Sequence, residues 1–176
     1  MSLSIAKFDR YDLVNNPKDK TASFTIWFSG CDMKCKNCQN PILWDKNKGH
    51  KYTAESVAKI VCATCNQLNL KSVVLLGGEP LQQDIQELLF ICQQFREAGL
   101  KVWLYTGYEF DDIPKDLLPY LSTIKCGRYK DELKQEGFPA SSNQKIYKRI
   151  MYTDRFADVT EFMRNDEFTS QLLVME

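Results

Sequence analysis

The sequence has little that would serve hydrolytic chemistry, secretion or membrane insertion. Its 176 residues include one histidine, His50, which argues mildly against hydrolytic acid–base catalysis. The N-terminus has neither a continuous apolar segment nor a small-residue cleavage site, so it does not read as a secretory signal. The longest purely apolar runs, such as residues 73–76, are far too short to span a bilayer. We therefore expect a soluble, cytoplasmic protein.

Net charge is also absent, because 23 basic residues balance 23 acidic ones. Proteins that bind nucleic acids or membranes over a broad surface usually have a net positive charge, so we expect neither partner. A local basic patch remains possible. A chain of this length fits one domain and can bury roughly 70% of the surface that its unfolded form exposes. We expect one domain over residues 1–176, with a core at about 22–150 and a variable tail at 151–176.

Cysteine, in contrast, is plentiful, with seven residues. In a reducing cytoplasm, cysteines indicate metal binding, redox chemistry or core packing rather than a disulfide framework, and the odd number points the same way. Cys62 and Cys65 fall in an expected helix, as does Cys92, and core packing is the commoner role there. A redox pair or a partial second cluster at Cys62 and Cys65 stays open. Cys126 ends an expected strand, where it could pack or face an active site.

Strands and helices alternate along the chain, which predicts right-handed crossovers and a mainly parallel sheet. The chain is too short for a complete eight-stranded barrel, which takes about 250 residues. We therefore expect an α/β fold built as a partial, open β/α barrel of five or six strands. The periodicity predicts strands at 22–28, 72–76, 101–105, 122–126 and 147–152, helices at 54–68, 81–98, 112–120 and 158–164, and a final strand or tail at 171–174.

Three cysteines follow the first of these strands with the spacing Cys31-x-x-x-Cys35-x-x-Cys38. Three thiolates at this spacing on a loop can bind three of the four irons of a cubane cluster. The fourth iron then stays open, and an open coordination position is typical of a catalytic metal site. The alternatives are core packing, or a zinc site completed by His50 or an aspartate. Zinc sites usually show paired cysteines, and no second pair lies at a convincing distance.

Other motifs extend this pattern. Gly77-Gly78-Glu79-Pro80 follows the next buried strand, and the carboxyl ends of parallel strands share one edge of a sheet. With the cysteine motif, it resembles the radical S-adenosylmethionine (SAM) superfamily. Residues 28–31, 39–41, 104–108 and 141–145 are similar to segments of the activating proteins of anaerobic (class III) ribonucleotide reductase, and the resemblance covers about residues 8–150.

One departure keeps a second enzyme class open. Cys126-Gly127 stands where those activating proteins often have Asp-Gly. A small radical SAM enzyme that acts on a metabolite, similar to 7-carboxy-7-deazaguanine synthase, is therefore an alternative. A non-catalytic zinc-binding module is the third.

The resemblance implies a specific chemistry. Cys31, Cys35 and Cys38 would hold a 4Fe-4S cluster, and SAM would bind the open iron through its amino and carboxylate groups. One electron would then split SAM into methionine and a 5′-deoxyadenosyl radical, with the protein supplying position and exclusion of water. In the family, this radical removes a hydrogen atom from a backbone glycine of the reductase large subunit.

The resemblance also assigns roles in SAM binding. Gly77 and Gly78 would let the backbone approach the methionine end closely. Glu79 would pair with its ammonium group, and Asn37 and Gln39 would contact the adenosyl portion. By itself, the segment 77–80 also fits a tight turn between a strand and a helix.

The electron donor is expected to be reduced flavodoxin or a similar acidic protein. Its docking surface would be a group of lysines around the cysteine motif, for which a merely solvated loop is the alternative. An incomplete barrel also leaves an opening at its side, which suits a macromolecular substrate. These lysines are Lys34, Lys36, Lys46, Lys48 and Lys51.

Overall fold

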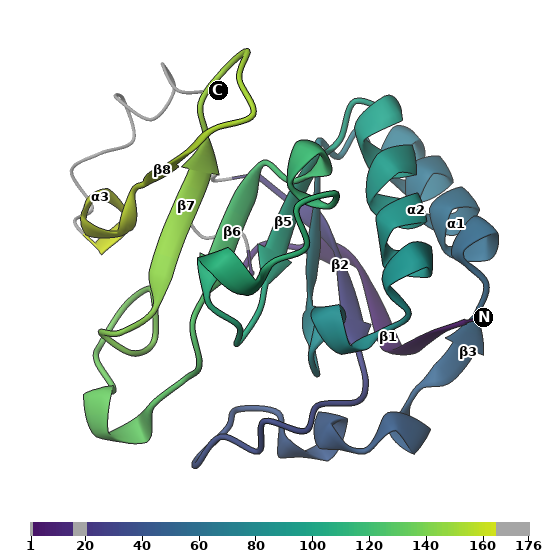
Figure 1. The fold of residues 1–176 in the computed structure, drawn as a ribbon. Helices are drawn as coiled ribbons and strands as arrows, with labels where there is room; N and C mark the ends of the chain where they lie inside the picture. The colour runs from purple at the N-terminus through teal and green to yellow at the C-terminus, as the bar shows by residue number, and fades with distance from the viewer. Residues whose placement is uncertain (1, 16–20, 165–176) are drawn as a thin grey trace.

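Eight strands form one mixed sheet in the computed structural model, which describes residues 2–15 and 21–164 (Figure 1). Two helices, α1 and α2, cover one face of this sheet, and the short helix α3 lies beside β7 at the other end. The sheet order is β3-β1-β2-β4-β5-β6-β7-β8. The strands are β1 (Leu3–Asp12), β2 (Ser23–Phe28), β3 (His50–Tyr52), β4 (Ser72–Gly77), β5 (Lys101–Tyr105), β6 (Thr123–Cys126), β7 (Lys145–Arg149) and β8 (Phe156–Asp158), and the helices are α1 (Ala54–Leu68), α2 (Ile85–Glu97) and α3 (Thr160–Arg164).

The four central strands β2, β4, β5 and β6 are parallel neighbours. Parallel neighbours need a crossover connection. Here α1 connects β2 with β4, α2 connects β4 with β5, and a segment of 3-10 turns connects β5 with β6. Their carboxyl ends therefore lie at one edge of the sheet, where the cysteine motif and Gly77-Gly78-Glu79 begin.

The predicted strand number and direction were wrong, although the mixed α/β class is confirmed. There are eight strands rather than five or six, and four of the seven pairings are antiparallel. The reason is that β1, β3, β7 and β8 join the sheet without a helical crossover. The barrel is not confirmed, because in the described part of the chain β3 and β8 each pair with a single strand and leave the sheet open.

The helix starts follow from local capping. The Thr53 hydroxyl accepts a hydrogen bond from the Ser56 amide at the start of α1, as predicted. Asp84 caps α2, which therefore begins at Ile85 rather than at residue 81. The predicted helix 112–120 was wrong. The segment forms 3-10 turns at Phe110–Asp112 and Leu118–Tyr120, and Pro119, near the end of the predicted helix, lacks the amide that regular helical hydrogen bonding needs.

Strand β4 is buried on both faces, as its unbroken apolar run predicts. Val73 and Leu75 belong to the main core, which β4 shares with α1 and α2. Val74 and Leu76 point to a smaller cluster on the opposite face, together with Trp103 from β5. The central strands are thus packed on both faces, which fixes the position of the loops that follow their carboxyl ends.

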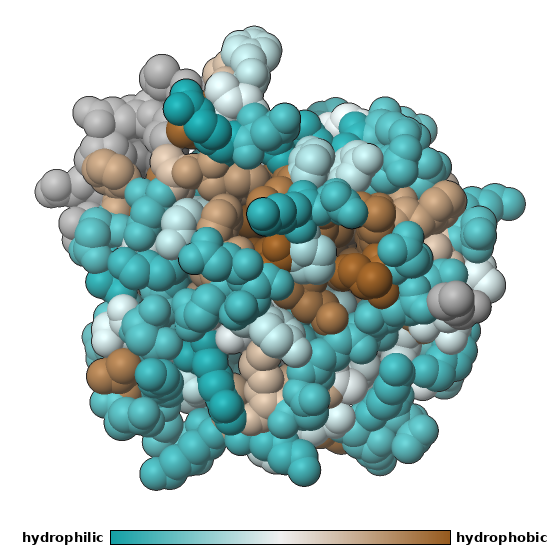
Figure 2. Space-filling view, in the orientation of Figure 1, coloured by the Kyte–Doolittle hydropathy of each residue, from teal (hydrophilic) through white to brown (hydrophobic). Residues whose placement is uncertain are grey.

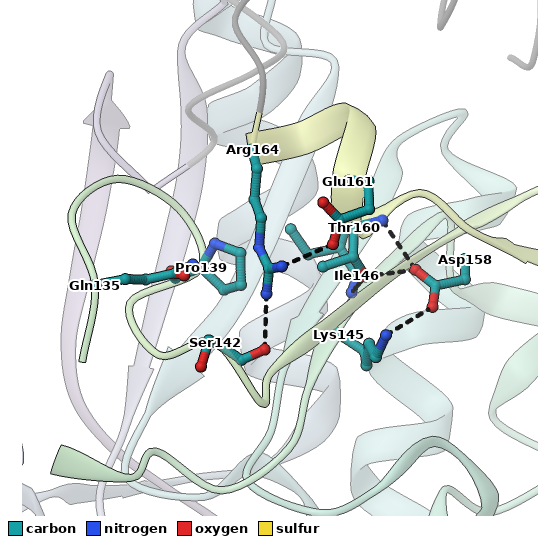
Figure 3. A network of polar contacts seen from close by, with 9 residues as sticks. All are labelled: Gln135, Pro139, Ser142, Lys145, Ile146, Asp158, Thr160, Glu161 and Arg164. Atoms are coloured by element: carbon teal, nitrogen blue, oxygen red, sulfur yellow. Dashed lines mark hydrogen bonds and ion pairs between the residues drawn. The ribbon is translucent and has the colours of Figure 1, made fainter. Parts of the chain in front are cut away.

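The C-terminal elements are integrated into this second cluster. Met163 of α3 is buried there, and β8 pairs antiparallel with β7. Figure 3 shows that Thr160 accepts a hydrogen bond from the Ile146 amide at 2.9 Å, while Arg164 donates to the Ser142 carbonyl at 2.7 Å. The fold therefore includes residues 156–164, and the predicted strand or tail at 171–174 lies outside the described residues.

The face of the molecule that is turned to the viewer in Figure 1 is largely polar. Figure 2 shows a mostly hydrophilic face, with hydrophobic residues gathered near its middle. None of the helices in the described ranges has the length and apolar character needed to cross a membrane.

Candidate functional site

The cysteine motif begins directly after β2, at the edge where the parallel strands end. Backbone hydrogen bonds fix this start, because the Gly30 amide donates to the Leu43 carbonyl at 2.8 Å and the Cys31 amide to the Trp44 carbonyl at 3.1 Å. Gly30 has a φ of 100°, a left-handed conformation that glycine adopts without strain. The chain therefore turns sharply at Gly30 and projects the following residues, 31–38, as a loop that we call the cysteine loop.

The three motif cysteines line one cavity of about 380 Å³ and are partly buried. Within the loop, the Cys38 amide donates to the Cys35 carbonyl at 3.2 Å, and the Asn40 amide contacts the Cys38 sulfur at 3.4 Å. Among the described residues, no three His, Cys, Asp or Glu side chains form a group that could hold a metal ion. A cubane differs from a single ion, because each cysteine binds an iron of its own, and the three thiols of this short loop do line one cavity.

The second predicted segment, residues 77–79, forms another wall of the same cavity. The Gly78 amide donates to the Phe28 carbonyl at 2.8 Å, and the Glu79 amide donates to the Gly30 carbonyl at 2.9 Å. A Cβ atom on Gly78 would lie 2.6 Å from the Gly30 oxygen, and Gly77 has a φ of 113°. The two glycines are therefore required for the close approach of this segment to the start of the cysteine loop.

Glu79 is a buried carboxylate with a side-chain exposure of only 2%. It accepts hydrogen bonds from the Thr106 hydroxyl and the Gly107 amide, each at 2.8 Å, and from the Leu81 amide at 3.0 Å. Burial raises the pKa of Glu79, although these three donors act in the opposite direction. The carboxylate is thus held in one orientation at the cavity wall.

A cation that sequence reasoning missed lies in the same cavity. Lys125 of β6 lines it, with its Nζ atom 5.7 Å from the centre of the Tyr105 ring. Burial lowers the pKa of Lys125 to about 8, against the attraction of nearby thiol and carboxylate groups, Glu79 among them. The available signal was a lysine beside apolar residues in a predicted strand.

The two residues predicted to contact the adenosyl portion lie in different places. Gln39 lines the cavity. Asn37 is exposed and is not among the lining residues; its side-chain amide donates to Asp131 at 2.8 Å. The segments 104–108 and 141–145, which carried the narrower resemblance, contribute Thr106, Gly107 and Gln144 to the lining.

The other cysteines lie in the main core. Cys65 of α1, Cys92 of α2 and Cys126 of β6 are buried there. Burial raises the pKa of Cys65 and of Cys126 to about 12, so these thiols are protonated near neutral pH. This favours the packing interpretation for all three. Cys62 packs against the same core and is partly buried.

The donor set around the cavity fits an iron–sulfur cluster with an amino-acid-like ligand. Three sulfur ligands on one short loop suit three irons of a cubane. The buried carboxylate of Glu79 lies in the same cavity, where it suits a positively charged ammonium group. A volume of about 380 Å³ is within the usual range for small-molecule sites, roughly 300–1,000 Å³.

Comparison with known proteins defines the class. Residues 21–147 match the family described as the 4Fe-4S single cluster domain, and the chain belongs to this family. The resemblance to radical SAM enzymes found in the sequence is confirmed, and the chain is a radical SAM oxidoreductase with a 4Fe-4S cluster and SAM as cofactors.

Individual relatives narrow the class. The chain is 31% identical over 146 residues to the anaerobic ribonucleoside-triphosphate reductase-activating protein of Vibrio cholerae, covering 78% of this chain and 92% of the relative. It is 29% identical over 143 residues to the protein of the same name from Enterobacteria phage T4, covering 77% and 88%. A 7-carboxy-7-deazaguanine synthase from Rhodopirellula baltica is 33% identical over 91 residues, covering 52% of this chain and 33% of the relative.

Proposed function

We propose that this protein activates an anaerobic ribonucleotide reductase by generating a glycyl radical in its large subunit. The observation that carries the proposal is the common cavity formed by Cys31, Cys35, Cys38 and the buried Glu79. Nearly full-length similarity to activating proteins of that reductase supports the choice of partner. The match to the deazaguanine synthase covers only a third of that relative, so a metabolite substrate has less support.

Each cavity residue has a proposed task. Cys31, Cys35 and Cys38 bind three irons and leave the fourth to SAM. Glu79 accepts hydrogen bonds from the SAM ammonium group, because its buried carboxylate is already fixed by donors from the segment after β5. Gln39 contacts the adenosyl portion, since it lines the cavity next to Cys38.

When bound and reduced, the cluster and SAM supply a 5′-deoxyadenosyl radical that can remove a hydrogen atom from a carbon centre. The protein's own residues orient SAM and limit the access of water. Gly77 and Gly78 support this by holding the β4 end against the start of the cysteine loop. No general base is required, which agrees with the single histidine, His50, lying in the edge strand β3.

The electron donor is proposed to be a reduced flavodoxin or a similar acidic protein. The lysines near the cysteine loop are all exposed, as docking requires. Because such contacts are electrostatic, the rate of cluster reduction should fall as the salt concentration rises.

Anaerobic reconstitution tests the reaction. The wild-type protein should form a four-iron cluster and release 5′-deoxyadenosine when SAM and dithionite are added. Cys35→Ala should lose both properties and keep its fold, whereas Cys62→Ala, a cysteine outside the cavity, should keep both. Stoichiometric zinc without SAM cleavage would instead indicate a zinc-binding module.

A second experiment tests the partner. The reduced, reconstituted protein is mixed with SAM and the anaerobic reductase, and electron paramagnetic resonance should detect the doublet of a glycyl radical. SAM cleavage without this doublet, but with turnover of a deazaguanine precursor, would favour the metabolite enzyme.

A further inference from the structure

Two side chains from a distant part of the sequence hold the middle of the cysteine loop. The Asn37 amide donates to Asp131 at 2.8 Å, and the Arg128 guanidinium donates to the Met33 carbonyl. Arg128 and Asp131 lie in the segment between β6 and β7, residues 127–144, which we call the β6–β7 loop. Both loops lie at the same edge of the molecule (Figure 1).

The cysteine loop has little internal support of its own. Lys34 and Asn37 have φ angles of 48° and 55°, a left-handed conformation that is unfavourable for residues other than glycine. Within the loop, the described backbone hydrogen bonds include the Cys38 amide to the Cys35 carbonyl, a single short turn. A conformation of this kind persists only where surrounding groups hold it.

The two contacts are placed in the two gaps of the cysteine motif. Met33 lies between Cys31 and Cys35, and Asn37 lies between Cys35 and Cys38. Each interval between neighbouring cluster ligands is therefore attached to the β6–β7 loop at one point. Such attachments restrict how far the second and third cysteines can move relative to the first.

Asp131 also connects this clamp with the cavity wall. One carboxylate oxygen accepts from Asn37, and the Tyr129 hydroxyl lies 3.3 Å from the other. Tyr129 lines the cavity. A third contact comes from another part of the chain, because the Asp32 amide donates to the Gln82 side chain at 3.0 Å.

We propose that Arg128 and Asp131 are positioning residues that hold Cys35 and Cys38 at the correct separation from Cys31 for the cluster. The role toward the cluster rests on the proposed function, whereas the clamp itself is a property of the protein without cofactors. Neither residue is among those that line the cavity, and each acts through the cysteine loop.

Hydrogen exchange of the iron-free protein tests the clamp directly. In Arg128→Ala and Asp131→Ala, amides 32–38 should exchange about tenfold faster than in the wild type, because a hydrogen bond to a charged group is lost. Glu132→Ala is the matched control, since Glu132 is exposed in the same 3-10 turn, Asp131–Leu133, and should leave the exchange unchanged.

A charge swap separates the clamp from general destabilisation. Asn37→Asp places two carboxylates opposite each other and should speed exchange further. Combining it with Asp131→Asn restores one donor and one acceptor in reversed order, and Asp tolerates the left-handed backbone. The double variant should return to within about threefold of the wild-type exchange rate. Wild-type exchange in Asp131→Ala, or merely additive effects in the double variant, would overturn the clamp.

The role toward the cluster needs a spectroscopic readout. After anaerobic reconstitution, Asp131→Ala should give a shifted or broadened electron paramagnetic resonance signal of the reduced cluster, and the double variant should restore the wild-type signal. An unchanged signal in Asp131→Ala would overturn the positioning role. Failure of the wild-type protein to bind a cluster would refute the proposed function, while the exchange result would still stand.

Discussion

Glu79 combines two properties that rarely occur together, deep burial and a full set of hydrogen-bond donors from the protein. Three donors fix its carboxylate, and burial still raises its pKa. The attraction of Lys125 offsets part of the cost of burying this charge, and a cationic ligand would offset more of it. This is why Glu79, among the cavity residues, is the expected partner of an ammonium group.

Replacing Glu79 by Gln tests this residue. The amide removes the negative charge and leaves the Gly107 amide facing a donor, so the affinity for SAM should fall by about 1.5–3 kcal/mol. Calorimetric titration of the reconstituted protein with SAM measures the change. Glu97→Gln, on the exposed surface of α2, is the control. Equal affinities for SAM in Glu79→Gln and wild type would contradict the assignment.

Asp12, the last residue of β1, gives a pH-dependent prediction outside the cysteine motif. Its carboxylate is 5% exposed and accepts from the Thr25 hydroxyl at 2.6 Å and the Val14 amide at 2.7 Å. Burial alone would raise the pKa of Asp12, but its hydrogen bonds outweigh burial and lower it below 3.8. The resulting stability is present above the unfolded-state pKa and is lost as the pH falls through the lowered value.

Asp12→Asn should therefore lower the free energy of unfolding by about 2 kcal/mol near neutral pH, with a smaller difference in acid. Urea unfolding between neutral pH and about pH 3 measures both effects. Asp9→Asn is the control from the same strand, because its ion pair with Lys7 is on the surface and contributes little. A constant difference across this pH range would contradict the argument.

Residues with a strong local pattern could be predicted from the sequence, and residues defined by tertiary contacts could not. Cys31, Cys35, Cys38 and Glu79 lie in short motifs whose spacing carries the chemistry, and the structure brings them to one cavity. Lys125 and Asp131 have no such motif. Lys125 reaches the cavity because of the strand order, and Asp131 contacts Asn37, which lies 94 residues away in the sequence. A local sequence pattern encodes neither of these relationships.

At the scale of elements, the end of β4 and the turn at Gly30 are joined by backbone hydrogen bonds, from the Gly78 amide to the Phe28 carbonyl and from the Glu79 amide to the Gly30 carbonyl. A Cβ atom at position 78 would meet the Gly30 oxygen at 2.6 Å and the Leu43 oxygen at 3.0 Å. Neither neighbour is a flexible side chain that can turn away. The two elements would have to separate to admit even one methyl group.

Gly78→Ala should therefore reduce the iron content after reconstitution and destabilise the protein by about 1–3 kcal/mol. Iron analysis and urea unfolding measure the two effects. Gly99→Ala is the control, because its φ of 76° also strains an alanine, but the position has open space around it and lies after α2. Loss of iron in both variants would show that general strain, rather than the contact at Gly30, is responsible.

The Thr160 hydroxyl is one of several contacts that attach α3 to β7, together with the burial of Met163 and the hydrogen bond from the Val159 amide to the Ile146 carbonyl. Thr160 accepts from the Ile146 amide and also bonds the Asp158 carboxylate (Figure 3). Thr160→Val should destabilise the protein by about 1–3 kcal/mol, since it leaves a buried amide without its acceptor. Thr160→Ser keeps the hydroxyl and should stay within about 1 kcal/mol of wild type. Urea unfolding distinguishes the two, and equal losses would indicate that packing of the methyl group matters instead.

The strands and helices of the parallel, crossover-connected part of the sheet were predicted well. The antiparallel strands that extend the sheet were not. Helix α1, strand β4 and strand β5 agree with their patterns within a residue. Strand β1 was missed because its alternation is broken by register shifts against β2, between Ile5 and Lys7 and between Asp9 and Asp12. Strands β3 and β8 have only three residues each, too few for a periodic signal.

At the scale of the whole molecule, cofactor binding and folding should be coupled. SAM at about a hundredfold its dissociation constant stabilises by about 2.7 kcal/mol. For a chain of this size, that corresponds to a rise in melting temperature of about 5–10 °C. The rise should require prior iron loading, since the open iron is the proposed anchor of SAM. Anaerobic scanning calorimetry with Cys35→Ala as the control measures it, and an equal rise in that variant would contradict the coupling.

The two faces of the sheet are covered by different elements. Helices α1 and α2 cover one of them, while the cavity opens at the carboxyl edge of the strands. The exposed Lys59 belongs to α1, and no residue of α1 is among those that line the cavity. A linker attached selectively at this position, through a Lys59→Cys substitution for example, would therefore immobilise the molecule on an electrode or a bead and leave the cavity accessible to solvent. This arrangement would allow the redox properties of the immobilised protein to be measured by surface voltammetry.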